Sequence, residues 1–146
     1  PPVVDASTGE LLPAISEEIG NLLLNEGIGE LLDLACGLGT PTAFSNANAY
    51  IGVGDSVTAE AATQTDLQAA SNKTYKAMAA SYPSRSAQTV TWRAVFGSAD
   101  ANYAWQEFTV VNASSGTGKN LNRKVSNQGT KASGQTWTLD LAITLS

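Results

Sequence analysis

The chain has 146 residues, of which 42% are apolar, so it is long enough to form one folded domain with a hydrophobic core. Histidine is absent and Cys36 is the single cysteine, which removes the commonest general base, any cysteine zinc cluster and any internal disulfide. The first 72 residues contain ten acidic and no basic residues, and the rest contain three acidic and eight basic ones. Because only Arg123 and Lys124 are adjacent basic residues, nucleic-acid binding is disfavoured.

Apolar residues at helical spacing come first along the chain. They recur three and four apart and predict a helix over about residues 13–25: Leu11, Leu12, Ile15, Ile19, Leu22 and Leu23. A second, shorter stripe over residues 28–35 ends before Gly37. We interpret both stripes as an arm that buries its apolar face on a partner, and we expect Cys36 to be a small buried residue.

Turn-forming residues 37–48 separate this arm from the rest of the chain. We therefore predict two parts, a helical arm and linker over residues 1–48 and an antiparallel β-domain over residues 49–146. There is no run of about 18 apolar residues and no basic region before Leu22, so we expect neither a membrane span nor a signal peptide.

Short strands with regular turn signals follow. We predict strands over residues 49–53, 90–96, 103–111, 121–125 and 135–146, and a short helix over residues 65–70. Residues 112–118 are typical of a hairpin connection. The expected fold is a β-sandwich or an open barrel. Strict alternation in two of the strands predicts a shared core of Trp92, Phe96, Trp137, Leu139, Leu141 and Ile143.

Glu107 is the one residue whose position asks for a chemical explanation. It lies in an apolar strand, where an unpaired carboxylate is costly or becomes protonated. A catalytic acid needs a second carboxylate nearby, and the β-domain offers only Asp100 and Asp140. We therefore expect a structural ion pair with Arg123 or Arg93 on an adjacent strand. No residue pattern indicates a catalytic triad, a metal site or a cofactor.

The residues from Tyr50 to Ser146, about two thirds of the chain, resemble small β-domains of bacteriophage virion proteins of the tail, fibre and head-decoration type. The resemblance is carried, in order, by Ile51-Gly-Val-Gly-Asp-Ser56, Ala61-Ala-Thr-Gln-Thr-Asp-Leu67, the run from Val95 to Phe108, Asn120-Leu-Asn-Arg-Lys-Val125 and Gly129-Thr-Lys-Ala-Ser-Gly134. Residues 1–48 have no counterpart in it. The resemblance implies a structural role for Glu107 and no catalytic site.

A virion protein of this length is expected to be a capsid decoration or cement protein, assembled in the host cytoplasm, that binds the major capsid protein or another virion protein and forms homo-oligomers. A tail, neck or fibre adaptor is the alternative within the same class. A carbohydrate-binding adhesin module is the alternative outside it, for which the loops offer mainly Phe44, Tyr75 and Tyr82. If the chain is a decoration or cement protein, we expect the arm of residues 1–35 to cross to neighbouring subunits or to the capsid surface and to hold copies together.

Overall fold

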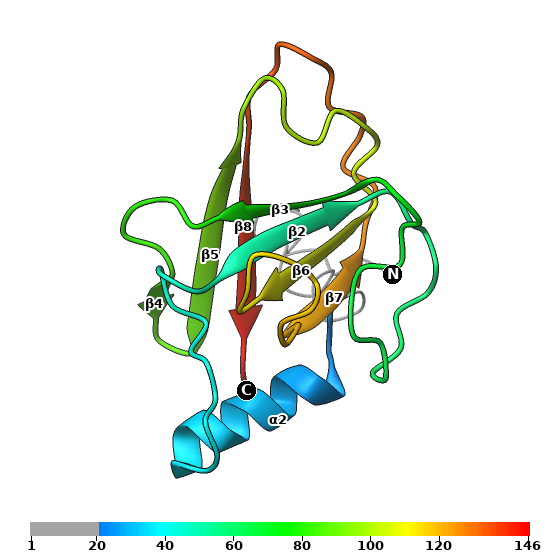
Figure 1. The fold of residues 1–146 in the computed structure, drawn as a ribbon. Helices are drawn as coiled ribbons and strands as arrows, with labels where there is room; N and C mark the ends of the chain where they lie inside the picture. Colours follow the sequence, from blue (N-terminus) through cyan, green and yellow to red (C-terminus); the bar gives the residue numbers. More distant parts are fainter. Residues whose placement is uncertain (1–20) are drawn as a thin grey trace, which may run out of the picture.

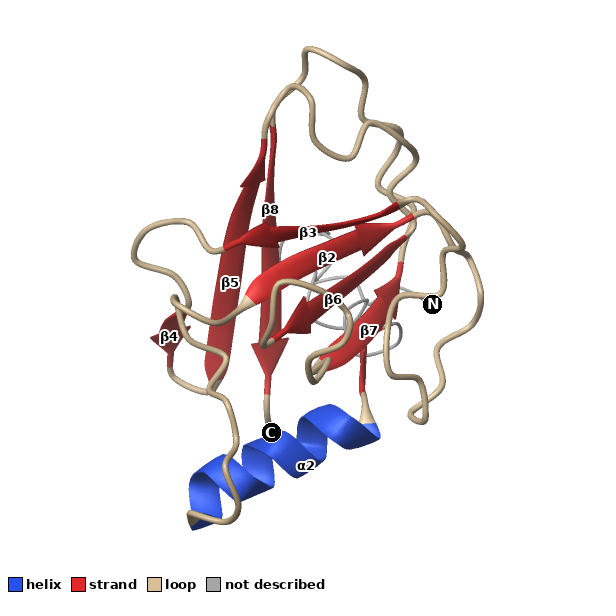
Figure 2. Cartoon of the chain, in the orientation of Figure 1, coloured by secondary structure: helices blue, strands red, loops and turns tan. Residues whose placement is uncertain are grey.

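The computed structural model of the chain describes residues 21–146, which form two antiparallel β-sheets packed across one core (Figures 1 and 2). The five-stranded sheet has the order β1-β7-β6-β2-β3, and the three-stranded sheet has the order β4-β5-β8. The strands are β1 (Asn21–Leu23), β2 (Tyr50–Gly54), β3 (Lys73–Ala77), β4 (Ser84–Ser86), β5 (Thr89–Phe96), β6 (Glu107–Val111), β7 (Asn122–Val125) and β8 (Trp137–Thr144). The mainly β, sandwich-like fold that the sequence predicts is confirmed.

The three-stranded sheet follows the alternation seen in the sequence. Its strands β5 and β8 pair along their full length, from Thr89 opposite Thr144 to Phe96 opposite Trp137. Paired residues share a face of the sheet, so this register sets Trp92 beside Leu141 on the side of the core. The two strands run behind β2 and β3 and cross them at a steep angle (Figure 1).

The core lies between the two sheets. Of the six residues predicted for it, Trp92, Phe96, Leu141 and Ile143 are buried, while Trp137 and Leu139 are partly buried and pack against the same cluster. The five-stranded sheet adds its own alternate residues, Ile51, Val53, Phe108 and Val110. The ring of Trp105 lies edge-on to the rings of Phe96 and Trp137, with centroid separations of 4.8 Å and 5.0 Å.

The helix α2 (Asn25–Cys36) covers one end of the sandwich, beside the C-terminus of the chain (Figure 1). Leu24, between β1 and α2, is fully buried, and its N–H donates a hydrogen bond to the carbonyl of Leu121. Gly27 lies so close to the backbone just before β7 that a Cβ atom would stand 2.5 Å from the Cα of Leu121. The helix ends at Gly37, whose φ of 66° suits glycine. The second predicted helix is therefore confirmed, whereas the predicted boundary at residues 48 and 49 stays a prediction.

Three local predictions are wrong where the structure describes the residues. The helix predicted over residues 13–25 falls mostly on residues outside the described range, and Asn21–Leu23 is a strand because it pairs with β7. The segment 65–70 forms no helix, since the N–H groups of Gln68 and Ala69 donate to the carboxylate of Glu107 instead of to their own turn. Residues 103–106 precede β6 rather than extending it.

Cys36 is exposed, which corrects the prediction that it is buried. It is the last residue of α2, and its neighbours Ala35 and Gly37 are exposed as well. Among residues 21–146, no helix is long and apolar enough to cross a lipid bilayer.

Candidate functional site

The structure brings Glu107 and Arg123 together on the outer face of the five-stranded sheet, on the neighbouring strands β6 and β7. The Nε atom of Arg123 donates a hydrogen bond of 2.8 Å to Oε2 of Glu107. The Nη2 atom also lies 2.8 Å from Oε2 but makes no well-directed hydrogen bond, so its attraction to the carboxylate is electrostatic. Both side chains are 0% exposed. Arg93, the other candidate partner, instead pairs with Asp140.

The loop of residues 55–72 closes over this ion pair and supplies most of its remaining partners. The N–H groups of Gln68 and Ala69 each donate a hydrogen bond of 2.8 Å to one oxygen of Glu107. From the other side, Nη1 of Arg123 donates to the carbonyl of Thr58 at 2.8 Å and to the side-chain oxygen of Gln64 at 3.2 Å. The carboxylate is therefore satisfied by a cation and by backbone donors, as a buried charge requires.

Gly54 makes room for Glu107. The two residues are directly opposite each other in the pairing of β2 with β6, and a Cβ atom on Gly54 would stand 2.3 Å from Oε1 of Glu107. Gly54 thus has a packing role. Ser56 hydrogen-bonds to Thr58, and Asp55 accepts a hydrogen bond from Asn72.

A second polar cluster lies on the same face. The carboxylate of Asp66 contacts the ammonium of Lys73 at 3.0 Å and accepts a hydrogen bond from the hydroxyl of Tyr75. Burial, together with that hydrogen bond, raises the pKa of Tyr75 far above its ordinary range. The turn between β6 and β7 packs on Asp66, because a Cβ atom on Gly116 would stand 2.0 Å from Oδ1 of Asp66. The cluster therefore anchors two loops.

This arrangement suits a structural role better than an acid–base role. A general acid must come within hydrogen-bonding distance of its substrate, and neither Glu107 nor Arg123 has any exposed surface. Among residues 21–146, no group of three or more His, Cys, Asp or Glu side chains is placed to hold a metal ion. What the site can do is fix the loop of residues 55–72 to the sheet.

No family model, curated protein or solved structure matches this chain.

Of the six apolar residues predicted for the arm, two lie within the described residues 21–146. Leu11, Leu12, Ile15 and Ile19 lie outside the described residues. Leu22 is 37% exposed at the edge of the sheet, and Leu23 faces an apolar cavity at the end of the sandwich.

Aromatic side chains, which would form the contact surface for a sugar, are mostly engaged inside the protein. The indole N–H groups of Trp92 and Trp105 donate to the carbonyls of Phe44 and Ala101. Phe44 itself is buried, and the guanidinium of Arg93 covers the ring of Tyr82 at 4.4 Å. Trp137 is the one tryptophan that is only partly buried.

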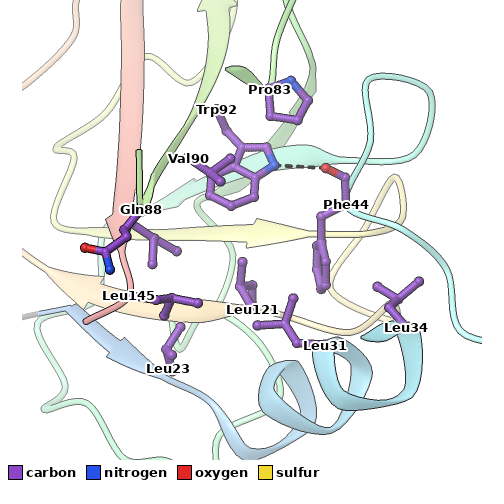
Figure 3. A pocket seen from close by; sticks show the side chains of 11 residues that line it. Leu23, Leu31, Leu34, Phe44, Pro83, Gln88, Val90, Trp92, Leu121 and Leu145 are labelled. Atoms are coloured by element: carbon purple, nitrogen blue, oxygen red, sulfur yellow. Dashed lines mark hydrogen bonds between the residues drawn. The ribbon is translucent and has the colours of Figure 1, made fainter. Parts of the chain in front are cut away.

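The apolar cavity is a feature that the sequence did not predict. It has a volume of about 280 Å³ and opens between α2 and the ends of β5 and β8 (Figure 3). Its walls are apolar apart from one amide: Leu23, Leu31, Leu34, Phe44, Pro83, Gln88, Val90, Trp92, Leu121, Ile143 and Leu145. These residues come from segments far apart in the sequence, so periodicity within one element gives no sign of it.

Proposed function

We propose that this chain is a non-enzymatic structural protein of a bacteriophage particle, a decoration or cement protein that binds the assembled capsid lattice through the major capsid protein or another virion protein. The observation that carries the proposal is the exposed apolar face of α2 beside the open apolar cavity. Leu32 of α2 and Leu38, just beyond the end of α2, are each 57% exposed. Clustered exposed apolar side chains of this size mark protein–protein contact surfaces.

The enclosure of Glu107 supports a role without catalysis. The chain contains no histidine, and Glu107, whose carboxylate is the most deeply buried among residues 21–146, is held by Arg123 and two backbone N–H groups. Such a site fixes a loop to a sheet and offers no reacting atom to a substrate. The resemblance of residues 50–146 to virion β-domains supports the same class of function.

Mass spectrometry of purified particles tests the proposal. A decoration or cement protein is expected at a copy number comparable with that of the major capsid protein, because it occupies a repeated position on the lattice. A tail, neck or fibre adaptor is expected at only a few copies per particle. Absence of the chain from purified particles would refute both forms of the proposal.

Rebinding provides the functional readout. Particles that lack this chain should bind the purified protein up to a saturating occupancy and should then resist heat or chelator treatment better than undecorated particles. A chain that binds without any gain in particle stability is a decoration protein and not a cement protein.

A carbohydrate-binding module is the second candidate, and one observation favours it. A shallow cavity of about 400 Å³ is lined by Trp105, Gln128, Thr136, Trp137, Thr138 and Leu139. An aromatic side chain with an amide and hydroxyl groups is chemistry that can hold a neutral sugar. Glycan binding that is lost in Trp137→Ala, with the fold retained, would favour this candidate over the capsid role.

A further inference from the structure

We infer that a second copy of this chain docks on the end face of the sandwich formed by α2, the β4–β5 turn and the end of β8, and that the two copies form a two-fold symmetric dimer. We call this surface the end face and define it by the apolar cavity and the exposed residues around it. The inference rests on the proposed function only in assuming that many copies assemble side by side.

The end face is too wide for a small ligand to cover. Leu34 and Leu145 line the cavity and are also 36% and 52% exposed, so the apolar surface continues out of the cavity. Leu32 and Leu38 extend it along and beyond α2. Figure 3 shows Leu34 and Leu145 at opposite sides of the cavity, with Leu31 between them. A compound that filled the cavity would leave the outer leucines in water.

The two rims of the end face carry opposite charge. On one side, α2 contains Glu26, Glu30 and Asp33 and no basic residue. Glu26 and Glu30 accept hydrogen bonds from Asn120 and Asn112, while Asp33 is half-buried and has no ion pair among residues 21–146.

On the other side, Arg85 of β4 is paired with Val90, which lines the cavity, so its side chain leaves the strand on the cavity side. It is exposed, and its guanidinium donates to the carbonyl of Ala87 in its own turn. Within the described part of the chain it has no carboxylate partner.

A two-fold axis through the end face satisfies both rims at once. In such a contact, if residue i of one copy meets residue j of the other, then j also meets i. Setting α2 of one copy against β4 of the other places each Asp33 near the Arg85 of the second copy and buries the exposed leucines of α2 against the second copy. Contact of α2 with α2 would instead bring acidic residues together. Charge complementarity therefore selects the arrangement of α2 on β4.

Sedimentation velocity of the full chain over a range of concentrations tests the inference. The wild-type chain should dimerise. Asp33→Arg and Arg85→Asp should each weaken dimerisation by about tenfold, because each places like charges together twice in one dimer. The double variant should recover most of the wild-type affinity, since it exchanges the two charges without removing the pair.

A second pair of variants replaces an exposed apolar residue by aspartate, once on the end face and once outside it. Leu38→Asp should abolish the dimer, whereas Val57→Asp should leave it unchanged, because Val57 is 70% exposed in the loop of residues 55–72, outside the end face. Both positions are exposed, so both variants are expected to fold, which circular dichroism checks.

A wild-type chain that stays monomeric at every concentration overturns the inference, including the case in which residues before Asn21 or an unrelated protein cover the end face. A dimer that is insensitive to Asp33→Arg, Arg85→Asp and Leu38→Asp also overturns it, because another surface must then be responsible. Neither result bears on the particle measurements, so failure of the dimer and failure of the capsid role are distinguishable.

Discussion

At the scale of single residues, the ion pair of Glu107 and Arg123 decides how the loop of residues 55–72 is held. Replacing Glu107 by Ala leaves a fully buried guanidinium without its counter-charge and removes the acceptor for two N–H groups of the loop. We expect a loss of about 3–5 kcal/mol in the free energy of unfolding. Denaturation with urea measures it.

The matched control is Asp140→Ala, which breaks the exposed ion pair with Arg93. Exposed pairs contribute little because water screens them, so this change should be much smaller than that of Glu107→Ala. Equal losses in the two variants would mean that the Glu107 site is open to solvent.

Tyr103 provides a prediction for alkaline pH. Burial raises the pKa of its phenol from 10.0 to about 12, while its hydroxyl donates to the carbonyl of Val53 at 3.1 Å. The folded state therefore holds this proton more tightly than the unfolded state does. The resulting stabilisation is complete below pH 10 and is lost as the pH rises towards 12. Wild-type protein should thus lose more stability over this range than Tyr103→Phe does, as measured by urea denaturation at each pH. Parallel curves would assign the alkaline loss to other groups.

At the scale of elements, α2 can pack closely on Leu121 because residue 27 is a glycine and has no side chain. A Cβ atom on Gly27 would collide with the backbone of Leu121, whereas a Cβ atom on Gly29 would meet nothing within 4 Å. Gly27→Ala should therefore destabilise the protein by about 1–3 kcal/mol. Gly29→Ala should stabilise it by about 0.5–1 kcal/mol, because alanine favours the helix. Thermal or urea unfolding of the two variants gives the answer, and a shift of the same sign in both would show that α2 does not pack on Leu121.

The strand β8 is the second element whose packing can be measured. Leu141 faces the core opposite Trp92, while Val95 of β5 is 41% exposed on the other face of the sheet. Leu141→Ala removes buried methyl groups and should cost about 2–5 kcal/mol. Val95→Ala should cost far less, since little of its surface is withdrawn from water. A change below about 0.5 kcal/mol for Leu141→Ala would show that the register of β5 and β8 is wrong.

At the scale of the whole molecule, one core joins both sheets. Trp105 packs on Phe96 of the smaller sheet and on Phe108 of the larger one, at 4.8 Å and 6.2 Å between ring centroids. Because neither sheet has a core of its own, we expect one cooperative transition. Tryptophan fluorescence and far-ultraviolet circular dichroism should give coincident urea curves. Two separated midpoints would contradict this expectation.

The charge asymmetry of the chain is only partly used inside the fold. Of the four ion pairs formed by residues 21–146, Lys73 with Asp66 joins the acidic first part to the basic second part, and the other three lie within the second part. Of the acidic residues of α2, Glu26 and Glu30 bond to asparagine side chains, and Asp33 is half-buried.

The sequence by itself determined the elements whose signal is local. Strict alternation in residues 90–96 and 137–144 sets β5, β8 and the side of each that faces the core, because a strand needs only its own period of two to separate its faces. The pairing of Glu107 with a cationic partner was also predictable, since a carboxylate in an apolar strand needs one.

The conformation of other segments was decided by the tertiary structure alone, because contacts with distant residues override their local secondary-structure preference. Asn21–Leu23 is a strand because β7 offers it an edge, and residues 65–70 are a loop because Glu107 takes the N–H groups that a helix would use. The apolar end face exists because α2, β5 and β8 meet there, and no single segment carries its pattern. Hydrogen bonds and burial between distant segments are worth more than the weak propensity of six residues, and they set the final conformation.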